Sequence, residues 1–155
     1  MPDESNPGME AAHRFFAADC FNKAWELIDK TDRTAEDNER MLLLSMASAW
    51  HWTQRPDCTD QNMSAAYWQI AHIYGLLQQA DNARRFAELA LAKAKAKGVS
   101  PFFVAYAYEA LARAEMVAGD RDKMRAYLDK ARRAAKRLTD AEAQKMLLAD
   151  LEKIG

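Results

Sequence analysis

The sequence predicts an all-α fold in which antiparallel helix pairs stack into a solenoid. The first observation is that one segment occurs twice, 41 residues apart. A repeat at a fixed spacing of roughly 20–50 residues is typical of repeat architectures. The second is that only 5 glycines and 4 prolines interrupt an alanine-rich chain, which favours helix throughout. The third is a regular series of helix start and stop signals. The matched positions are Tyr67-Trp68-Gln69-Ile70-Ala71 with Tyr108-Glu109-Ala110-Leu111-Ala112, and Asp81, Phe86 and Ala90 with Asp122, Tyr127 and Ala131.

The N-terminal third predicts an irregular arm followed by three helices. Residues 1–7 are polar and contain two prolines, which predicts a disordered arm. We expect a short helix over 8–18, a second over 21–30, and a third over 35–54. Thr34 and Asp37 have the spacing of a capping box at the start of that third helix. Residues 55–60 contain a proline and read as a loop.

The remainder predicts five more helices, about eight in all. They span 62–80, about 82–97, 101–118, 120–138 and 140–153. The last carries the apolar stripe Met146, Leu147 and Leu151 and is expected to cap the end of the stack. The boundary signals are Gly98 as a C-cap, Ser100-Pro101 as a helix start, Gly119 as a second C-cap, and Thr139-Asp140-Ala141-Glu142 as a capping box.

The matched units resemble tetratricopeptide repeats, which are antiparallel helix pairs with small residues where the helices touch. The clearer units span about 62–97 and 101–138, and a degenerate one spans about 21–54. The spacing of 41 exceeds the usual ~34. Gln78 stands where the family has its turn glycine, and Gly119 fills that place in the second unit. The residues that carry the resemblance are Tyr67, Ile70, Ala71, Tyr74, Ala83, Ala90 and Leu91, then Ser100-Pro101, Tyr108, Leu111, Ala112, Gly119 and Ala131.

The resemblance implies a protein or peptide partner held in a concave groove lined by the first helix of each pair. The residues expected to face that groove are Trp68, His72, Tyr106, Glu109 and Arg113. An aromatic ring could anchor the partner and a charge pair could orient it. The alternative is ordinary packing, because Glu109 and Arg113 are four residues apart and would pair on any helix surface.

A second candidate is a pocket near Trp50, His51 and His72. Two tryptophans, Trp50 and Trp52, flank His51 close to a loop. Such a pocket would suit a small molecule or an enzyme. The competing interpretation is that the tryptophans are core residues at a junction between units.

Catalytic and metal signals are missing from the sequence. No nucleophile elbow or phosphate-binding glycine loop occurs, so an enzyme is not favoured, although a site assembled across helices would leave no linear motif. The three histidines lack metal-ligand spacing, and we expect no metal and no cofactor. Cys20 and Cys58 are expected to be reduced thiols. Without a signal peptide or a long apolar run, the expected location is the cytoplasm and no membrane contact is expected.

The net charge of −1 conceals a strong asymmetry along the chain. Residues 1–82 carry net −7, residues 83–137 net +8, and residues 138–155 net −2. The basic residues are expected on the outer helices as a solvated face, and the alternative is a contact with nucleic acid or an acidic protein. A nucleic-acid partner is not favoured, because no aromatic residues alternate with the cations as in single-strand binders. Opposite charge at the two ends predicts a weak homodimer as well as a possible charged partner.

Overall fold

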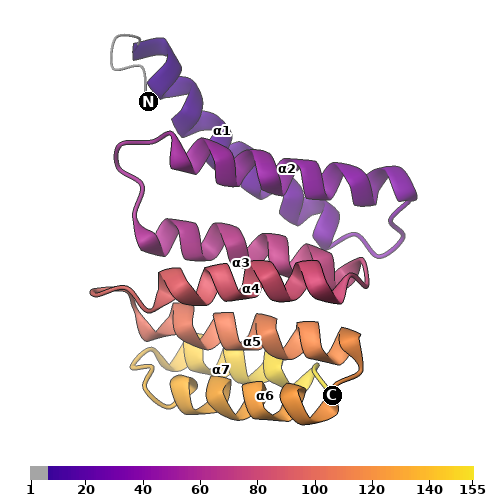
Figure 1. Ribbon diagram of the computed structural model, residues 1–155. Coiled ribbons are helices and arrows are strands. Elements are labelled where there is room, and N and C mark those ends of the chain that lie inside the picture. Colours follow the sequence, from indigo (N-terminus) through magenta and orange to yellow (C-terminus); the bar gives the residue numbers. More distant parts are fainter. Residues whose placement is uncertain (1–6) are drawn as a thin grey trace.

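Seven α-helices make up the computed structural model, which describes residues 7–155 (Figure 1). No strand occurs in that range, which confirms the all-α class. The disordered arm predicted over 1–7 lies outside the described residues, except for Pro7, which begins the first helix. The helices are α1 Pro7–Ile28, α2 Ala35–Thr53, α3 Asp60–Leu76, α4 Ala80–Ala94, α5 Pro101–Ala118, α6 Arg121–Ala135 and α7 Ala141–Glu152.

The sequence predicts two helices over 8–18 and 21–30, whereas the structure has the single helix α1. No glycine or proline lies between Ala18 and Phe21. The Lys23 ammonium lies 2.8 Å from the Asp19 carboxylate, a pair spaced i, i+4 that supports helix across the expected break. The count is therefore seven in residues 7–155 rather than about eight.

Most predicted helix caps are present, and two differ. Thr34 and Asp37 form the expected capping box, and Ser100 caps α5. The capping box expected from Thr139 is wrong, because Asp140 is itself the N-cap and accepts from the amides of Glu142 and Ala143. Helix α4 ends at Ala94, so its C-cap is Lys95 and not Gly98.

The 41-residue sequence repeat is also a repeat of contacts. The rings of Tyr67 and Phe86 lie 6.2 Å apart, and those of their counterparts Tyr108 and Tyr127 lie 6.3 Å apart. The alanines at the matched helix contacts are buried, as close approach of the backbones requires. Helices α3 and α4 therefore pack in the same way as α5 and α6.

The turns that end α3 and α5 share one backbone conformation. Gly119 has φ of 80° and Gln78 has φ of 60°. In both turns an amide bonds to a carbonyl five residues earlier, Gln79 to Tyr74 and Asp120 to Glu115, each at 3.0 Å. This is the Schellman arrangement, which usually places glycine at the left-handed position. Gln78 adopts that conformation against the steric preference of its Cβ.

We expect Gln78→Gly to raise the free energy of unfolding by about 0.5–1 kcal/mol, because it removes left-handed strain at the end of α3. Gly119→Ala is the matched reverse change and should lower it by about 1 kcal/mol. A Cβ at Gly119 would meet nothing within 4 Å, so this effect is conformational alone. Urea denaturation measures both, and a destabilised Gln78→Gly variant would show that this turn is not strained.

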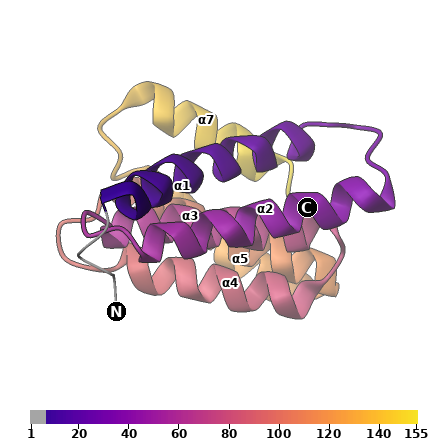
Figure 2. The same cartoon turned by 90° about the horizontal axis from the view of Figure 1, so that it is seen from above.

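Consecutive helices lie side by side, and α7 packs against both α5 and α6 (Figure 1). Seen from above, α1 and α7 lie along one side of the stack and α4 along the opposite side (Figure 2). Leu147 and Leu151 of α7 are buried in the core formed with α5 and α6. Met146, predicted in the same stripe, is exposed instead. Helix α7 thus leaves part of its apolar surface towards α1 and α3.

Candidate functional site

A cavity of about 260 Å³ opens where four helices meet. Helices α1, α3, α5 and α7 all contribute to its wall, and we call the surface around it the inner face. Two predicted site residues, Trp68 and Tyr106, line it. The only carboxylate in the wall is Asp150. The full lining is Trp25, Ser64, Ala65, Trp68, Phe102, Phe103, Tyr106, Met146 and Asp150.

Aromatic rings in contact with one another form the wall of this cavity, the aromatic pocket. Trp68 stacks on Trp25 with ring centroids 5.7 Å apart and meets the edge of Tyr106 at 5.7 Å. Phe102 packs on Tyr106 at 4.8 Å. Such pairs add to the stabilisation from apolar burial and hold the rings in place. The pocket is therefore a preformed apolar surface.

The indole of Trp68 is held from behind by a buried ion pair. Its Nε1 donates to Glu109 Oε2 at 3.0 Å, and Arg113 Nη2 and Nε donate to Glu109 Oε1 at 2.7 and 3.1 Å. Trp68 and Glu109 occupy equivalent positions of the two repeats. Glu109 is only 1% exposed. Its burial raises its pKa by more than the Arg113 guanidinium and the bond from Trp68 lower it.

Glu109 and Arg113 therefore support the aromatic pocket and do not line it. Their predicted i, i+4 pairing is present, but it is buried between helices, not on the groove surface. The stem of Arg113 passes close to Gly75, where an added Cβ would lie 3.1 Å from Arg113 Cδ. The small residue at 75 makes room for the arginine to reach Glu109.

Tyr106 is fixed by the last helix. Its hydroxyl donates to Asp150 Oδ2 at 2.8 Å, and Lys153 Nζ donates to Asp150 Oδ1 at 3.0 Å. Burial, with the bond to Asp150, raises the pKa of Tyr106 well above its usual range. Tyr106 therefore stays a neutral donor, and the charged group at the edge of the pocket is Asp150.

His72 lies behind the same wall. Its ring stacks on Trp68 with centroids 5.0 Å apart and lies 6.0 Å from Trp25. Its Nδ1 is buried without a hydrogen-bond partner among residues 7–155. Burial, together with the Arg113 charge, lowers the pKa of His72 to about 4. The imidazole is therefore neutral at pH 7 and packs as an aromatic ring.

The second predicted site does not come together around one pocket. His51 contacts Phe16 of α1, whereas His72 contacts Trp25 of the same helix. Nine residues of helix separate those two contacts, a distance of about 14 Å. Trp50 is 55% exposed, so the core interpretation is wrong for that residue.

His51 instead forms a pair with a histidine of α1. The Nδ1 atoms of His13 and His51 lie 2.9 Å apart, so one carries a proton and the other accepts. Partial burial and the nearby His13 lower the pKa of His51. The sequence separation of 38 residues hides this contact. The pair is partly buried and has no third polar partner in the described residues.

Sequence reasoning missed Trp25, Phe102, Phe103, Met146 and Asp150. The available signal was the Phe102-Phe103 doublet at the start of α5, since two adjacent aromatic side chains on a helix cannot both be buried in the contact with its pair partner, and both line the pocket. Met146 and Asp150 are spaced i, i+4 and so share a face of α7.

No helix in residues 7–155 has both the length and the apolar character needed to cross a membrane, and no group of three or more potential ligands in that range could hold a metal ion. In comparisons with family models, curated proteins and solved structures, no match to this chain was found.

Proposed function

We propose that this chain is a protein-interaction module with a tetratricopeptide-like solenoid fold, and that it binds a peptide segment of a partner on its inner face. The observation that carries the proposal is the aromatic pocket, to which the first helix of every pair contributes. Large apolar and aromatic side chains in desolvated pockets supply most of the affinity in protein recognition. An apolar side chain of the partner enters this pocket as the anchor.

The size of the pocket favours a side chain over a whole small molecule. Its 260 Å³ is below the 300–1,000 Å³ typical of small-ligand sites. Its single carboxylate already accepts from Tyr106 and Lys153, which leaves no free acid–base pair in the wall. Both points weigh against the alternative of a small-molecule pocket or an enzyme.

A second hollow extends the same surface. It measures about 200 Å³ and is lined by α1, α3 and the end of α2, with Phe21, Asn22 and Trp52 among its lining residues. Ala65 belongs to both hollows, so they adjoin. Trp25 in the first and Phe21 in the second are one turn apart on α1, about 6 Å along the axis. Two anchors at that separation fit a peptide with apolar residues spaced i, i+4 in a helix.

The chemistry at the rim indicates which residue accompanies the anchor. Asp150 is partly exposed and keeps lone pairs that can accept from a donor on the partner. A lysine or arginine beside the apolar anchor would meet this carboxylate. Because Lys153 already compensates part of the charge, we expect the contact to orient the peptide more than to add affinity.

Peptides selected on the wild-type protein from a random library should carry paired apolar anchors. Their affinity should fall on the order of tenfold or more in Phe103→Ala, because the wall of the pocket is lost. Phe103 is partly exposed, and its one close ring contact is Phe102 at 5.3 Å, so the fold should persist. Fluorescence polarisation measures the affinity.

Leu89→Ala is the matched control, because it removes an exposed apolar side chain from α4, outside the inner face. It should leave affinity unchanged. If the selected peptides bind Phe103→Ala as well as wild type, or if selection yields no binder, the inner face is not a peptide site.

A further inference from the structure

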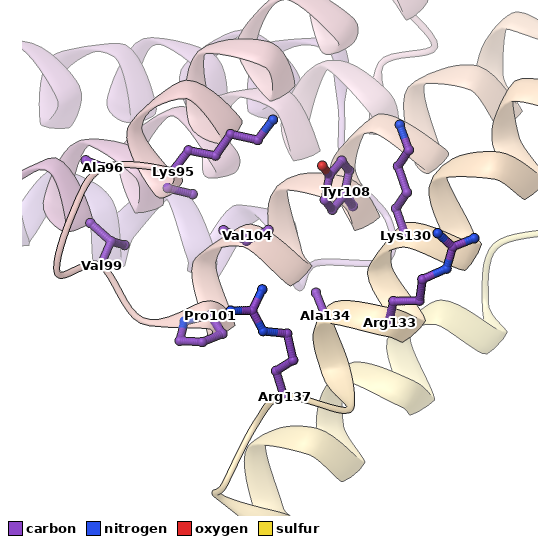
Figure 3. Close-up of a pocket in the computed structure, with 11 residues that line it drawn as sticks. Lys95, Ala96, Val99, Pro101, Val104, Tyr108, Lys130, Arg133, Ala134 and Arg137 are labelled. Carbon is purple, nitrogen blue, oxygen red and sulfur yellow. The ribbon is translucent and has the colours of Figure 1, made fainter.

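A further cavity, larger than the aromatic pocket, lies between the α4–α5 connection, the start of α5 and the end of α6 (Figure 3). It measures about 460 Å³ and shares no residue with the aromatic pocket. We call it the basic pocket, after the four cations in its lining: Lys95, Lys130, Arg133 and Arg137. No aspartate or glutamate lines it.

None of these four cations has a carboxylate partner in residues 7–155. Other cations of the same helices do have one. Arg84 binds Glu115 at 2.6 Å, Lys93 binds Asp60 at 3.1 Å, and Arg132 lies 3.4 Å from Asp129. All four side chains are solvent-exposed, and the pocket gathers their charges without a carboxylate at ion-pair distance. An anion bound among them would supply the counter-charge that no residue of the pocket provides.

Compensation of helix dipoles explains only part of this arrangement. Lys95 is the C-cap of α4 and Arg133 lies in the last turn of α6, where a cation is stabilising. Lys130 lies further inside α6, and Arg137 follows the helix. Dipole compensation also does not require that side chains from two helix ends face one cavity. In Figure 3, Arg137 reaches towards Pro101, and Lys95 and Lys130 rise from α4 and α6.

The floor of the basic pocket is apolar. Val99, Pro101, Val104 and the ring of Tyr108 form it, and the Lys130 ammonium lies 5.7 Å from the centre of that ring. A site that offers cations at the rim and an apolar surface beneath suits an anion with an apolar or planar body. The volume of 460 Å³ falls within the range of small-ligand sites.

We propose that the basic pocket binds a small organic phosphate. The guanidinium groups of Arg133 and Arg137 present paired donors that match phosphate oxygens, and the two lysines add point charges. The ring or apolar body of the ligand lies against Tyr108 and Val104.

Isothermal titration of the full chain at low ionic strength tests this with ADP, pyrophosphate and adenosine, and with hexaglutamate as an acidic peptide. ADP carries both parts of the ligand, pyrophosphate only the charge, and adenosine only the ring. ADP should bind, pyrophosphate should bind about tenfold more weakly, and adenosine should give no signal. In the double variant Arg133→Gln, Arg137→Gln the affinity for ADP should fall on the order of 100-fold, because two charged donors to the phosphate are lost.

The matched control is Arg121→Gln, Arg125→Gln, which removes two exposed cations from the same helix, outside the pocket. It should keep the affinity for ADP, and circular dichroism melting confirms that both double variants are folded. No binding of ADP, or equal losses in the two variants, overturns the proposal. Pyrophosphate binding as tightly as ADP excludes a role for the apolar floor. Hexaglutamate binding more tightly than ADP assigns the pocket to an acidic protein partner instead.

Discussion

Arg113→Met should lower the free energy of unfolding by about 3–5 kcal/mol, because it leaves the buried carboxylate of Glu109 without its cation. Glu109 is 1% exposed and receives two of its hydrogen bonds from Arg113. Methionine keeps the aliphatic stem that packs near Gly75, so the loss reports on the charge. Chemical denaturation at pH 7 measures the change.

The matched control is Arg40→Met. Glu36 and Arg40 have the same i, i+4 spacing as Glu109 and Arg113, but they are 82% and 59% exposed and 3.6 Å apart. Solvent screens such a pair, so its loss should amount to about 0.5 kcal/mol or less. An equally small loss for Arg113→Met would show that Glu109 is solvated in solution.

A second variant separates the unpaired charge from lost packing. Glu109→Gln combined with Arg113→Met removes both charges and keeps an oxygen that accepts from Trp68 Nε1. Replacing both members of a buried pair is often close to neutral, so most of the stability should return. Arg113→Met alone should also regain part of its free energy of unfolding as the pH falls, because protonation of Glu109 removes the unpaired charge. This sign follows from burial, which already raises the pKa of Glu109 in the wild type.

The sequence repeat predicted that α3 and α5 contribute to the inner face, but not the part that α1 and α7 play in it. Trp68 and Tyr106 were found because the first helix of each matched pair could be recognised. Trp25 was missed because its unit diverges from the repeat, and Asp150 because the last helix has no counterpart. The orientation of such helices depends on long-range packing, which local periodicity does not encode.

Residue spacing along the chain also could not show whether a charged pair is buried or whether distant cations meet at one cavity. It predicted that Glu109 and Arg113 would pair, yet the same i, i+4 pattern is exposed at Glu36 and Arg40. Similarly, Lys95 and Arg137 are more than forty residues apart in the sequence, and the sequence predicted a solvated outer face for both. The fold brings them to one cavity because α4 and α6 end on the same side of α5.

Acidification from pH 7 to pH 5 should lower the free energy of unfolding by about 2 kcal/mol through His72 alone. Its pKa is about 4 in the folded protein against an ordinary 6.5. The unfolded chain therefore binds a proton that the folded protein does not, and stability is lost as pH falls from above 6.5 towards 4. Below that interval both states are protonated and the effect levels off.

Burial is the largest cause of the lowered pKa of His72, and several charged groups modify it. Arg113 opposes a second positive charge and Asp150 favours one, while Arg33 and Lys153 add smaller repulsions. His72→Leu removes the titrating group and also the unpartnered Nδ1, so the variant should be at least as stable as wild type at pH 5. Urea unfolding of both proteins at pH 7 and pH 5 isolates the contribution of His72 from that of the other titrating groups.

If both proteins lose equal stability on acidification, water reaches the imidazole and His72 is not enclosed behind Trp68. If only the wild type loses the additional 2 kcal/mol, His72 is held neutral at the back of the aromatic pocket. Because its ring stacks on Trp68 and lies 6.0 Å from Trp25, protonation would place a charge directly behind the wall that binds the peptide anchor. Peptide affinity should therefore stay constant between pH 7 and pH 5, weaken only as the pH approaches 4 in the wild type, and show no such loss in His72→Leu.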